Sequence, residues 1–148
     1  MKKVILSLFV LTAILIGCSN GSSNDNLNWE TNLETALQKA KTENKAVLVN
    51  FTGSDWCVWC KRLSTEVFSK SEFEEYAEEN LILVKIDFPQ NIEQSAETKF
   101  YNNQLAQKFG IQGYPTILLL NSTGNLVLTT GYQPGGPVSY VEHLKNSL

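Results

Sequence analysis

The chain has 148 residues, of which 43% are hydrophobic, and its 15 acidic and 12 basic residues give a formal net charge of −3. This length suits one compact domain with a hydrophobic core of its own. The acidic balance and the lack of clustered lysines and arginines argue against nucleic acid as a partner.

The first 17 residues have the features of an export signal. Lys2 and Lys3 precede an apolar run from Val4 to Ile16, which is short for a membrane-spanning helix but suits the core of a secretory signal. Removal of residues 1–17 would leave 131 residues with a net charge of −5, because both lysines are lost with them. We expect this segment to be a lipoprotein signal peptide, because a cysteine directly follows it.

Cys18 directly follows this segment. Leu15-Ile16-Gly17-Cys18 resembles the bacterial lipobox, in which the cysteine is lipidated on sulfur and becomes the mature N-terminus. The alternative is an ordinary signal peptide that happens to contain a cysteine. The polar residues that follow are typical of a flexible tether. We therefore predict a lipidated Cys18, a tether over residues 18–27, and a membrane-anchored protein that faces the periplasm or the extracellular side.

The rest of the sequence predicts helices that alternate with strands. Thr31 and Glu34 have capping-box spacing, and the apolar periodicity after them predicts a helix to about Glu43. The apolar run from Ala46 to Phe51 is nearly unbroken, as is typical of a strand buried on both faces of a sheet.

The middle of the chain predicts three more helices and one strand. One helix is expected from Cys57 onward, and another after Ser69, which has capping-box spacing with Glu72. The apolar run from Leu81 to Asp87 predicts a second buried strand. A proline then breaks the pattern, and apolar residues at helical spacing predict a helix over about residues 95–109.

The last part of the chain predicts a hairpin and a helix. The strands Thr116–Leu120 and Leu126–Thr130 are joined by a turn-rich connection, which favours an antiparallel hairpin. Pro137 suits the first turn of a final helix. This order of elements implies an α/β domain with a mixed sheet and helices on both of its faces.

Cys57 and Cys60 are the only cysteines besides Cys18, and they form a Cys-x-x-Cys motif where the first strand meets a helix. The N–H groups at a helix N-terminus stabilise an anion, which favours the thiolate of Cys57 as a nucleophile. Cys60, one turn further along, is placed to attack a mixed disulfide formed at Cys57. In an exported protein such a pair either stays oxidised or is recharged by a dedicated electron donor.

Three other uses of this cysteine pair fit less well. A zinc site needs about four nitrogen or sulfur ligands, and beyond Cys18 the chain offers only the pair and His143. Haem attachment requires a histidine after the second cysteine, where this chain has Lys61. A purely structural disulfide that closes so short a loop would stabilise little. We predict a redox-active disulfide, with no metal and no other cofactor.

Two separated motifs resemble the thioredoxin superfamily. Trp56-Cys57-Val58-Trp59-Cys60-Lys61 is similar to the WCxxCK active-site motif of that family, and Gly113-Tyr114-Pro115-Thr116 to its cis-proline loop. The stretch over residues 51–61 looks most like a branch of exported bacterial thioredoxin-like proteins, many of them lipoproteins. The resemblance covers about residues 28–148 and implies a thioredoxin-like three-layer α/β/α domain with a mixed central sheet.

The resemblance also implies roles for individual residues. Cys57 is expected to be the attacking nucleophile and Cys60 the resolving thiol. Pro115 is expected to be cis and to face the cysteines, while Tyr114 offers backbone groups to a bound substrate chain. Trp56 is expected to shape the substrate groove.

The chain departs from the family at positions that we expect to tune the redox reaction. Thioredoxin has a buried aspartate where this chain has Asn50, which cannot ionise, so the proton of the inner cysteine needs another route, for example through water. Lys85 matches the lysine that partners this aspartate and would lack that ion pair. Val58 and Trp59 replace Gly-Pro, so the redox potential cannot be copied from thioredoxin.

Some features have a functional and a plain structural interpretation. The segment from Pro89 to about Asn103 is longer than in thioredoxin, either as an insertion that reshapes the surface or a partner site, or as a slightly longer helix. Trp59 lines the groove or only packs beside it. Asp55 is expected to cap the helix that begins near Cys57.

We predict an extracytoplasmic, membrane-anchored thiol-disulfide oxidoreductase that acts on protein thiols or disulfides of the cell envelope and receives electrons from a membrane donor. Reductase or isomerase activity is favoured, because no histidine lies between the cysteines to stabilise the thiolate as in strongly oxidising relatives. The alternative is a non-catalytic binding module, in which the same fold holds a client protein or a metal-loading partner.

Overall fold

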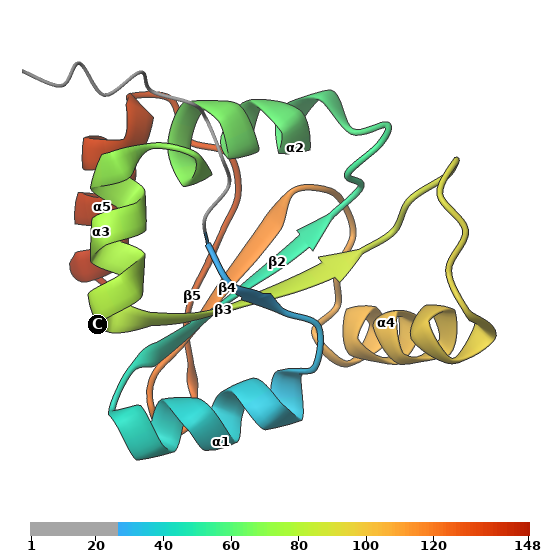
Figure 1. Ribbon diagram of the computed structural model, residues 1–148, viewed down its shortest axis with the longest axis horizontal. Coiled ribbons are helices and arrows are strands. Elements are labelled where there is room, and N and C mark those ends of the chain that lie inside the picture. The colour runs from blue at the N-terminus through green and yellow to red at the C-terminus, as the bar shows by residue number, and fades with distance from the viewer. Residues whose placement is uncertain (1–26) are drawn as a thin grey trace, which may run out of the picture.

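A five-stranded mixed sheet lies at the centre of the computed structural model, which describes residues 27–148 (Figure 1). Its strands stand in the order β1 (Trp29–Glu30), β3 (Leu81–Asp87), β2 (Ala46–Thr52), β4 (Thr116–Leu120) and β5 (Leu126–Thr130). β1, β3 and β2 are parallel, whereas β4 and β5 pair antiparallel to their neighbours. The predicted mixed sheet and hairpin are confirmed. The predicted signal segment and Cys18 lie outside the described residues.

Helices cover both faces of this sheet, as the sequence predicted (Figure 1). One face carries α1 and α4, and the other carries α2, α3 and α5. The helices are α1 (Leu33–Glu43), α2 (Val58–Leu63), the π-helical turn η1 (Ser64–Phe68), α3 (Ser71–Asn80), α4 (Ala96–Lys108) and α5 (Gly136–Lys145). Among residues 27–148 there is no helix with the length and apolar character needed to cross a membrane.

The core has two halves because successive side chains of a strand point to opposite faces. In β2, Leu48 packs toward α2, α3 and α5, while Val47 and Val49 pack toward α1 and α4. Every residue of β2 is buried, which explains its nearly unbroken apolar sequence. The start of α2 follows this strand, so the element that carries the cysteines is fixed to the centre of the sheet.

Two of the predicted helix caps are wrong. α1 is capped by Asn32, whose Oδ1 accepts a hydrogen bond from the N–H of Thr35 at 2.7 Å, and not by Thr31. Asparagine is the stronger cap of the two residue types, so it determines where the helix begins. α3 begins after Lys70 with no side-chain cap, because Ser69 is used to end the π-helical turn before it.

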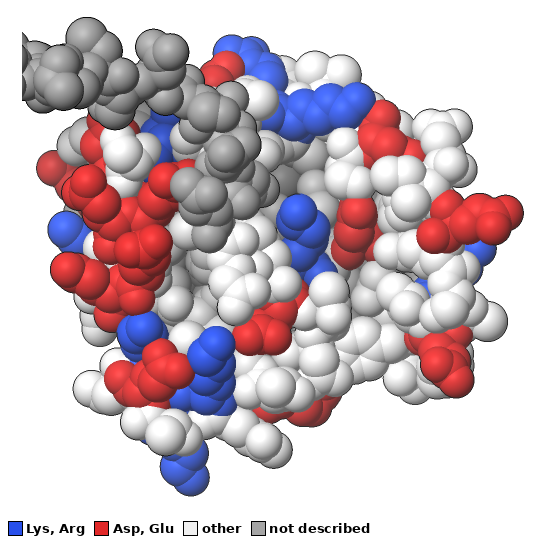
Figure 2. All heavy atoms as spheres, viewed as in Figure 1, with Lys and Arg blue, Asp and Glu red and all other residues white. Residues whose placement is uncertain are grey.

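Acidic side chains gather over one helix of the molecule. Figure 2 shows acidic side chains gathered over α3, at the left of the view. This helix contributes Glu72, Glu74, Glu75, Glu78 and Glu79. In Figure 1, α2 lies along the top of the molecule and begins at its end farther from α3, so this charge lies away from the cysteines.

Candidate active site

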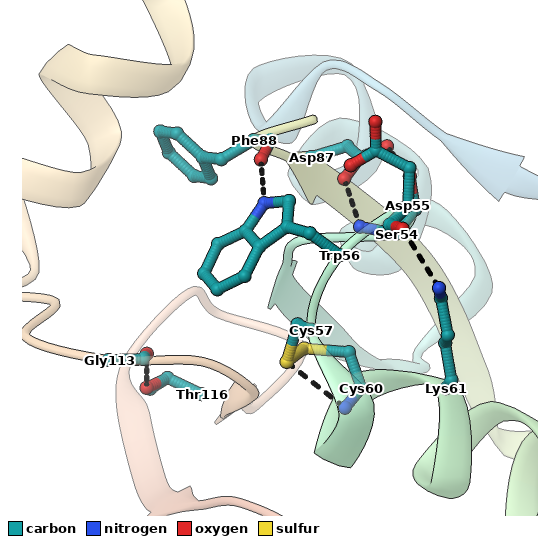
Figure 3. Close-up of a disulfide and its surroundings, with 10 residues drawn as sticks. All are labelled: Ser54, Asp55, Trp56, Cys57, Cys60, Lys61, Asp87, Phe88, Gly113 and Thr116. Atoms are coloured by element: carbon teal, nitrogen blue, oxygen red, sulfur yellow. Dashed lines mark hydrogen bonds between the residues drawn. A yellow bond between two sulfur atoms is a disulfide. The ribbon is translucent and has the colours of Figure 1, made fainter. Parts of the chain in front are cut away.

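Cys57 and Cys60 are joined by a disulfide at the beginning of α2 (Figure 3). The turn that follows β2 starts at Gly53, whose carbonyl oxygen accepts a hydrogen bond from the N–H of Cys57 at 2.9 Å. Cys57 has extended backbone angles and caps the helix, and its Sγ accepts a hydrogen bond from the N–H of Cys60 at 3.1 Å. A helix N–H directed at this sulfur stabilises the thiolate that forms when the pair is reduced.

Trp56 connects two loops beside the disulfide. Its Nε1 donates a hydrogen bond to the carbonyl oxygen of Phe88 at 2.8 Å, and its ring meets Tyr114 edge-on with 5.8 Å between ring centroids. Gly53 lies under the indole, where a β-carbon would overlap the ring. The indole is 37% exposed. Trp56 therefore forms part of the surface next to Cys57, and Gly53 is the residue that leaves room for it.

Asp55 does not cap α2, so this prediction is wrong. Its carboxylate accepts hydrogen bonds from the backbone N–H groups of Gln90, at 3.0 Å, and Asn91, at 2.6 Å. These bonds, with the one from Gln90 first, hold the pKa of Asp55 below its usual value. The turn from Gly53 directs Asp55 toward the loop after β3, and Cys57 takes the capping position instead.

The loop that carries Pro115 lies against Trp56. The Tyr114–Pro115 peptide bond is cis, as expected. The ring of Tyr114 packs between Trp56 and Phe88, and its centroid is 5.1 Å from that of Phe88. Figure 3 shows the loop segment between Gly113 and Thr116 on the same side of the disulfide as Cys57. Substrate binding by this loop stays a prediction.

A cluster around Trp59, at the start of α2, was not found from the sequence. Trp59 is 52% exposed, and its ring lies 5.2 Å from that of Tyr132 between centroids. The guanidinium of Arg62 lies over both rings, at 5.1 and 5.2 Å. Glu66 accepts hydrogen bonds from Tyr132 Oη at 2.6 Å and from Arg62 Nε at 2.9 Å. The bond from Tyr132, followed by that from Arg62, lowers the pKa of Glu66.

A cavity of about 160 Å³ lies on the inner side of Cys60, which lines it together with Asn50 and Lys85. Asn50 and Lys85 are paired neighbours on β2 and β3. Lys85 takes part in none of the ion pairs found among residues 27–148. Its ammonium instead lies 5.6 Å from the ring centre of Trp29, a residue of β1 that the sequence did not single out.

The structure thus arranges the predicted site residues in three groups around the disulfide. Trp56, Tyr114 and Pro115 lie on one side of Cys57, Val58 and Trp59 are exposed at the start of α2, and Asn50 and Lys85 line the cavity behind Cys60. In the described part of the chain, histidine, cysteine and carboxylate side chains nowhere gather in threes that could hold a metal ion.

A disulfide at the start of a helix, beside a cis-proline loop on a mixed sheet, defines a thioredoxin-like redox site. Residues 33–140 match the thioredoxin-like domain family, and the chain belongs to that family. It is 35% identical over 111 residues to the disulfide bond reductase DsbH of Chlamydia pneumoniae, an alignment that covers 75% of this chain and 67% of that protein.

Two further comparisons agree with this assignment. The solved structure of a DsbH oxidoreductase matches with a TM-score of 0.79 and 31% identity, over 93% of this chain and 94% of that one. The thiol:disulfide interchange protein DsbD of Yersinia pestis is 29% identical over 73% of this chain, which spans 17% of DsbD. The predicted fold class and the predicted enzyme class are confirmed: the protein is a thiol-disulfide oxidoreductase.

Proposed function

We propose that this oxidoreductase reduces disulfides of other proteins in the cell envelope. The surface around the nucleophile carries this proposal. Three large apolar side chains next to Cys57 are exposed: Trp56 by 37%, Val58 by 67% and Trp59 by 52%. Exposed apolar side chains grouped in this way are typical of a protein-docking surface. Cys57 itself is only 5% exposed, so a substrate sulfur reaches it when the substrate chain lies against these residues.

The reducing direction is supported by the relative that is named a disulfide bond reductase and by the residues between the cysteines. Val58 and Trp59 offer no imidazole to stabilise the thiolate of Cys57, and a less stabilised thiolate makes the reduced pair a better electron donor. Isomerase activity, which needs the same reduced pair, is the second candidate.

The proposed reaction transfers two electrons in two exchanges. The thiolate of Cys57 attacks a substrate disulfide, forms a mixed disulfide and releases one substrate sulfur as a thiolate. Cys60 then attacks Cys57, the second substrate sulfur leaves, and the pair ends as the disulfide seen here. We propose that the pair carries the electrons without another cofactor and that a membrane protein returns it to the dithiol.

The reduction potential and a trapping experiment test this function together. We expect a reduction potential of roughly −270 mV, as for thioredoxin. An enzyme that introduces disulfides would have a reduction potential of roughly −120 mV. Cys57→Ser is expected to abolish insulin reduction. Cys60→Ser is expected to accumulate mixed disulfides with envelope proteins, because the second exchange is blocked. A pair that does not equilibrate with thiol buffers, and no trapped partners, would instead favour the binding module.

We further propose that Cys18 is lipidated and anchors the enzyme on the extracytoplasmic side. The lipobox-like sequence before it and the polar tether after it support this proposal. Cells that express the protein with a labelled fatty acid should label it in the membrane fraction. Cys18→Ala should remove the label and release the protein from that fraction. A wild-type protein that stays unlabelled would contradict the anchor while leaving the redox function untouched.

A further inference from the structure

Two residues that line the cavity behind Cys60 each have a buried polar side-chain atom with no hydrogen-bond partner among residues 27–148. These atoms are the indole Nε1 of Trp29, a donor, and Oδ1 of Asn50, an acceptor. Asn50 is only 6% exposed. An unpaired buried polar atom costs free energy, so two of them on residues that line one cavity indicate that something in the cavity satisfies both.

The cavity has the character of a water site. A volume of about 160 Å³ is enough for several water molecules. Thr52, Ser54 and Ser64, which carry hydroxyl groups, line it together with Trp29 and Asn50, so polar side chains are available as partners for water. Thr52 is buried whereas Lys61, which also lines the cavity, is exposed, so the cavity runs from the sheet toward the surface.

Cys60 needs a proton acceptor that its protein neighbours do not supply. It is 6% exposed, so bulk water has little access to its sulfur. No carboxylate of residues 27–148 lines the cavity, and the charged groups that do are the ammonium groups of Lys61 and Lys85. The carboxylate of Asp87, at the end of β3, is bonded to the N–H and hydroxyl of Ser54, at 2.9 and 2.5 Å. The two positive charges favour a thiolate at Cys60 but cannot take its proton.

We propose that water in this cavity, positioned by Trp29 and Asn50, takes the proton of Cys60 when the mixed disulfide is resolved. The Cys60 thiol gives its proton to water, which passes it to solvent at the mouth of the cavity. The Cys60 thiolate then attacks Cys57, the Cys57–Cys60 bond forms, and the bond from Cys57 to the substrate sulfur breaks. The substrate leaves as a thiolate that is protonated by solvent. Trp29 and Asn50 are therefore positioning residues for the second exchange.

This proposal rests on thiol-disulfide exchange at the pair and not on its direction. When the disulfide is reduced, the same water returns a proton to the departing Cys60 thiolate. A failure of the reductase assignment would therefore leave the proposal standing, and a failure of the proposal would leave the reductase assignment standing.

The two exchanges can be separated with 5,5′-dithiobis(2-nitrobenzoic acid), mixed rapidly with the reduced full chain carrying Cys18→Ala, which removes the third thiol. Attack by Cys57 releases the first coloured thiolate, and attack by Cys60 releases the second. Trp29→Phe removes the N–H and keeps an aromatic ring against Phe68, which lies 5.4 Å away between centroids. Asn50→Leu removes the acceptor. We expect each variant to raise the pH midpoint of the second phase by about one unit, which slows that phase about tenfold at neutral pH. The first phase should stay unchanged.

Two further variants distinguish water positioning from general damage to the fold. Asn50→Thr keeps a neutral oxygen acceptor at this position without adding a base, and it is expected to retain the fast second phase. Phe68→Leu changes the apolar wall of the cavity without removing a polar atom, so its second phase should keep the wild-type pH midpoint. The proposal is overturned if Trp29→Phe and Asn50→Leu leave that midpoint unchanged, slow both phases alike, or are matched by Phe68→Leu.

Discussion

The carboxylate of Asp55 accepts a hydrogen bond from the backbone N–H of Asn91 at 2.6 Å, across 36 positions of sequence. This bond and its neighbour from Gln90 fix the loop after β3 next to the redox motif. Asp55→Ala is expected to release the loop, because two backbone donors lose their acceptor. Amide hydrogen exchange should speed up at Gln90 and Asn91 and stay slow in the buried strand β2. Unchanged exchange at both amides would show that the loop is held by other contacts.

The hydrogen bonds of Asp55 also predict that the stability of this loop depends on pH. Hydrogen bonds from Gln90 and then Asn91 lower the pKa of Asp55 from its usual value of 3.8. The stabilisation is therefore fully present above that value and is lost as the pH falls through the lower pKa of the folded protein. We expect the protection of the two amides, measured against their intrinsic exchange rates, to fall only below about pH 4. In Asp55→Asn this acid transition should be absent, and its survival there would assign it to another carboxylate.

Gly53→Ala tests the position of Trp56. A β-carbon at residue 53 would overlap the indole, which is partly exposed and can swing outward. We expect a stability loss of about 1 kcal/mol, and loss of the hydrogen bond to Phe88, seen as a shift of the indole N–H resonance. In a Trp56→Leu background the added methyl group should cost less. An equal loss of stability in both backgrounds would show that the methyl group strains the backbone and does not clash with the indole.

The regular elements were predictable because each one is encoded locally. Buried strands need apolar residues on both faces, so β2, β3 and β4 appear as short apolar runs. The predicted bounds of β3, Leu81–Asp87, are those of the structure. The strand-to-helix position of Cys57 follows from the same local pattern.

The contacts around the disulfide were not predictable because they join distant segments. β1 is two residues long, too short for any periodicity, and so Trp29 was not recognised as a wall of the cavity behind Cys60. Glu66 and Tyr132 are 66 positions apart. Asp55 is a second example. Local rules predict that an aspartate near the start of a helix caps it, but its carboxylate accepts a hydrogen bond from a loop 35 positions away.

Tyr132→Phe tests the cluster beside Trp59. Its hydroxyl donates to Glu66 at 2.6 Å, and this bond is the main cause of the lowered pKa of Glu66. Removing the donor destabilises the carboxylate, so the pKa of Glu66 should rise toward its usual value in an NMR titration. Tyr101→Phe is the matched control, because Tyr101 donates to Glu34 at 2.6 Å elsewhere in the fold. If both variants move the Glu66 titration alike, the change does not arise from the lost bond.

Gly131→Ala tests the support of the cis-proline loop. A β-carbon at residue 131 would stand 3.0 Å from the carbonyl oxygen of Pro115, which is backbone and yields less readily than a side chain. We expect a stability loss of about 1–3 kcal/mol in chemical denaturation. Because the loop lies beside the nucleophile, insulin reduction should fall by up to about a hundredfold.

The control for this change is Gly113→Ala in the same loop. A β-carbon at residue 113 would meet no atom within 4 Å, so stability should stay close to that of the wild type. Equal losses from the two substitutions would mean that the loop tolerates no added methyl group anywhere. A loss confined to Gly131→Ala means that this glycine sets the distance between the hairpin end and Pro115, and with it the position of the loop over Cys57.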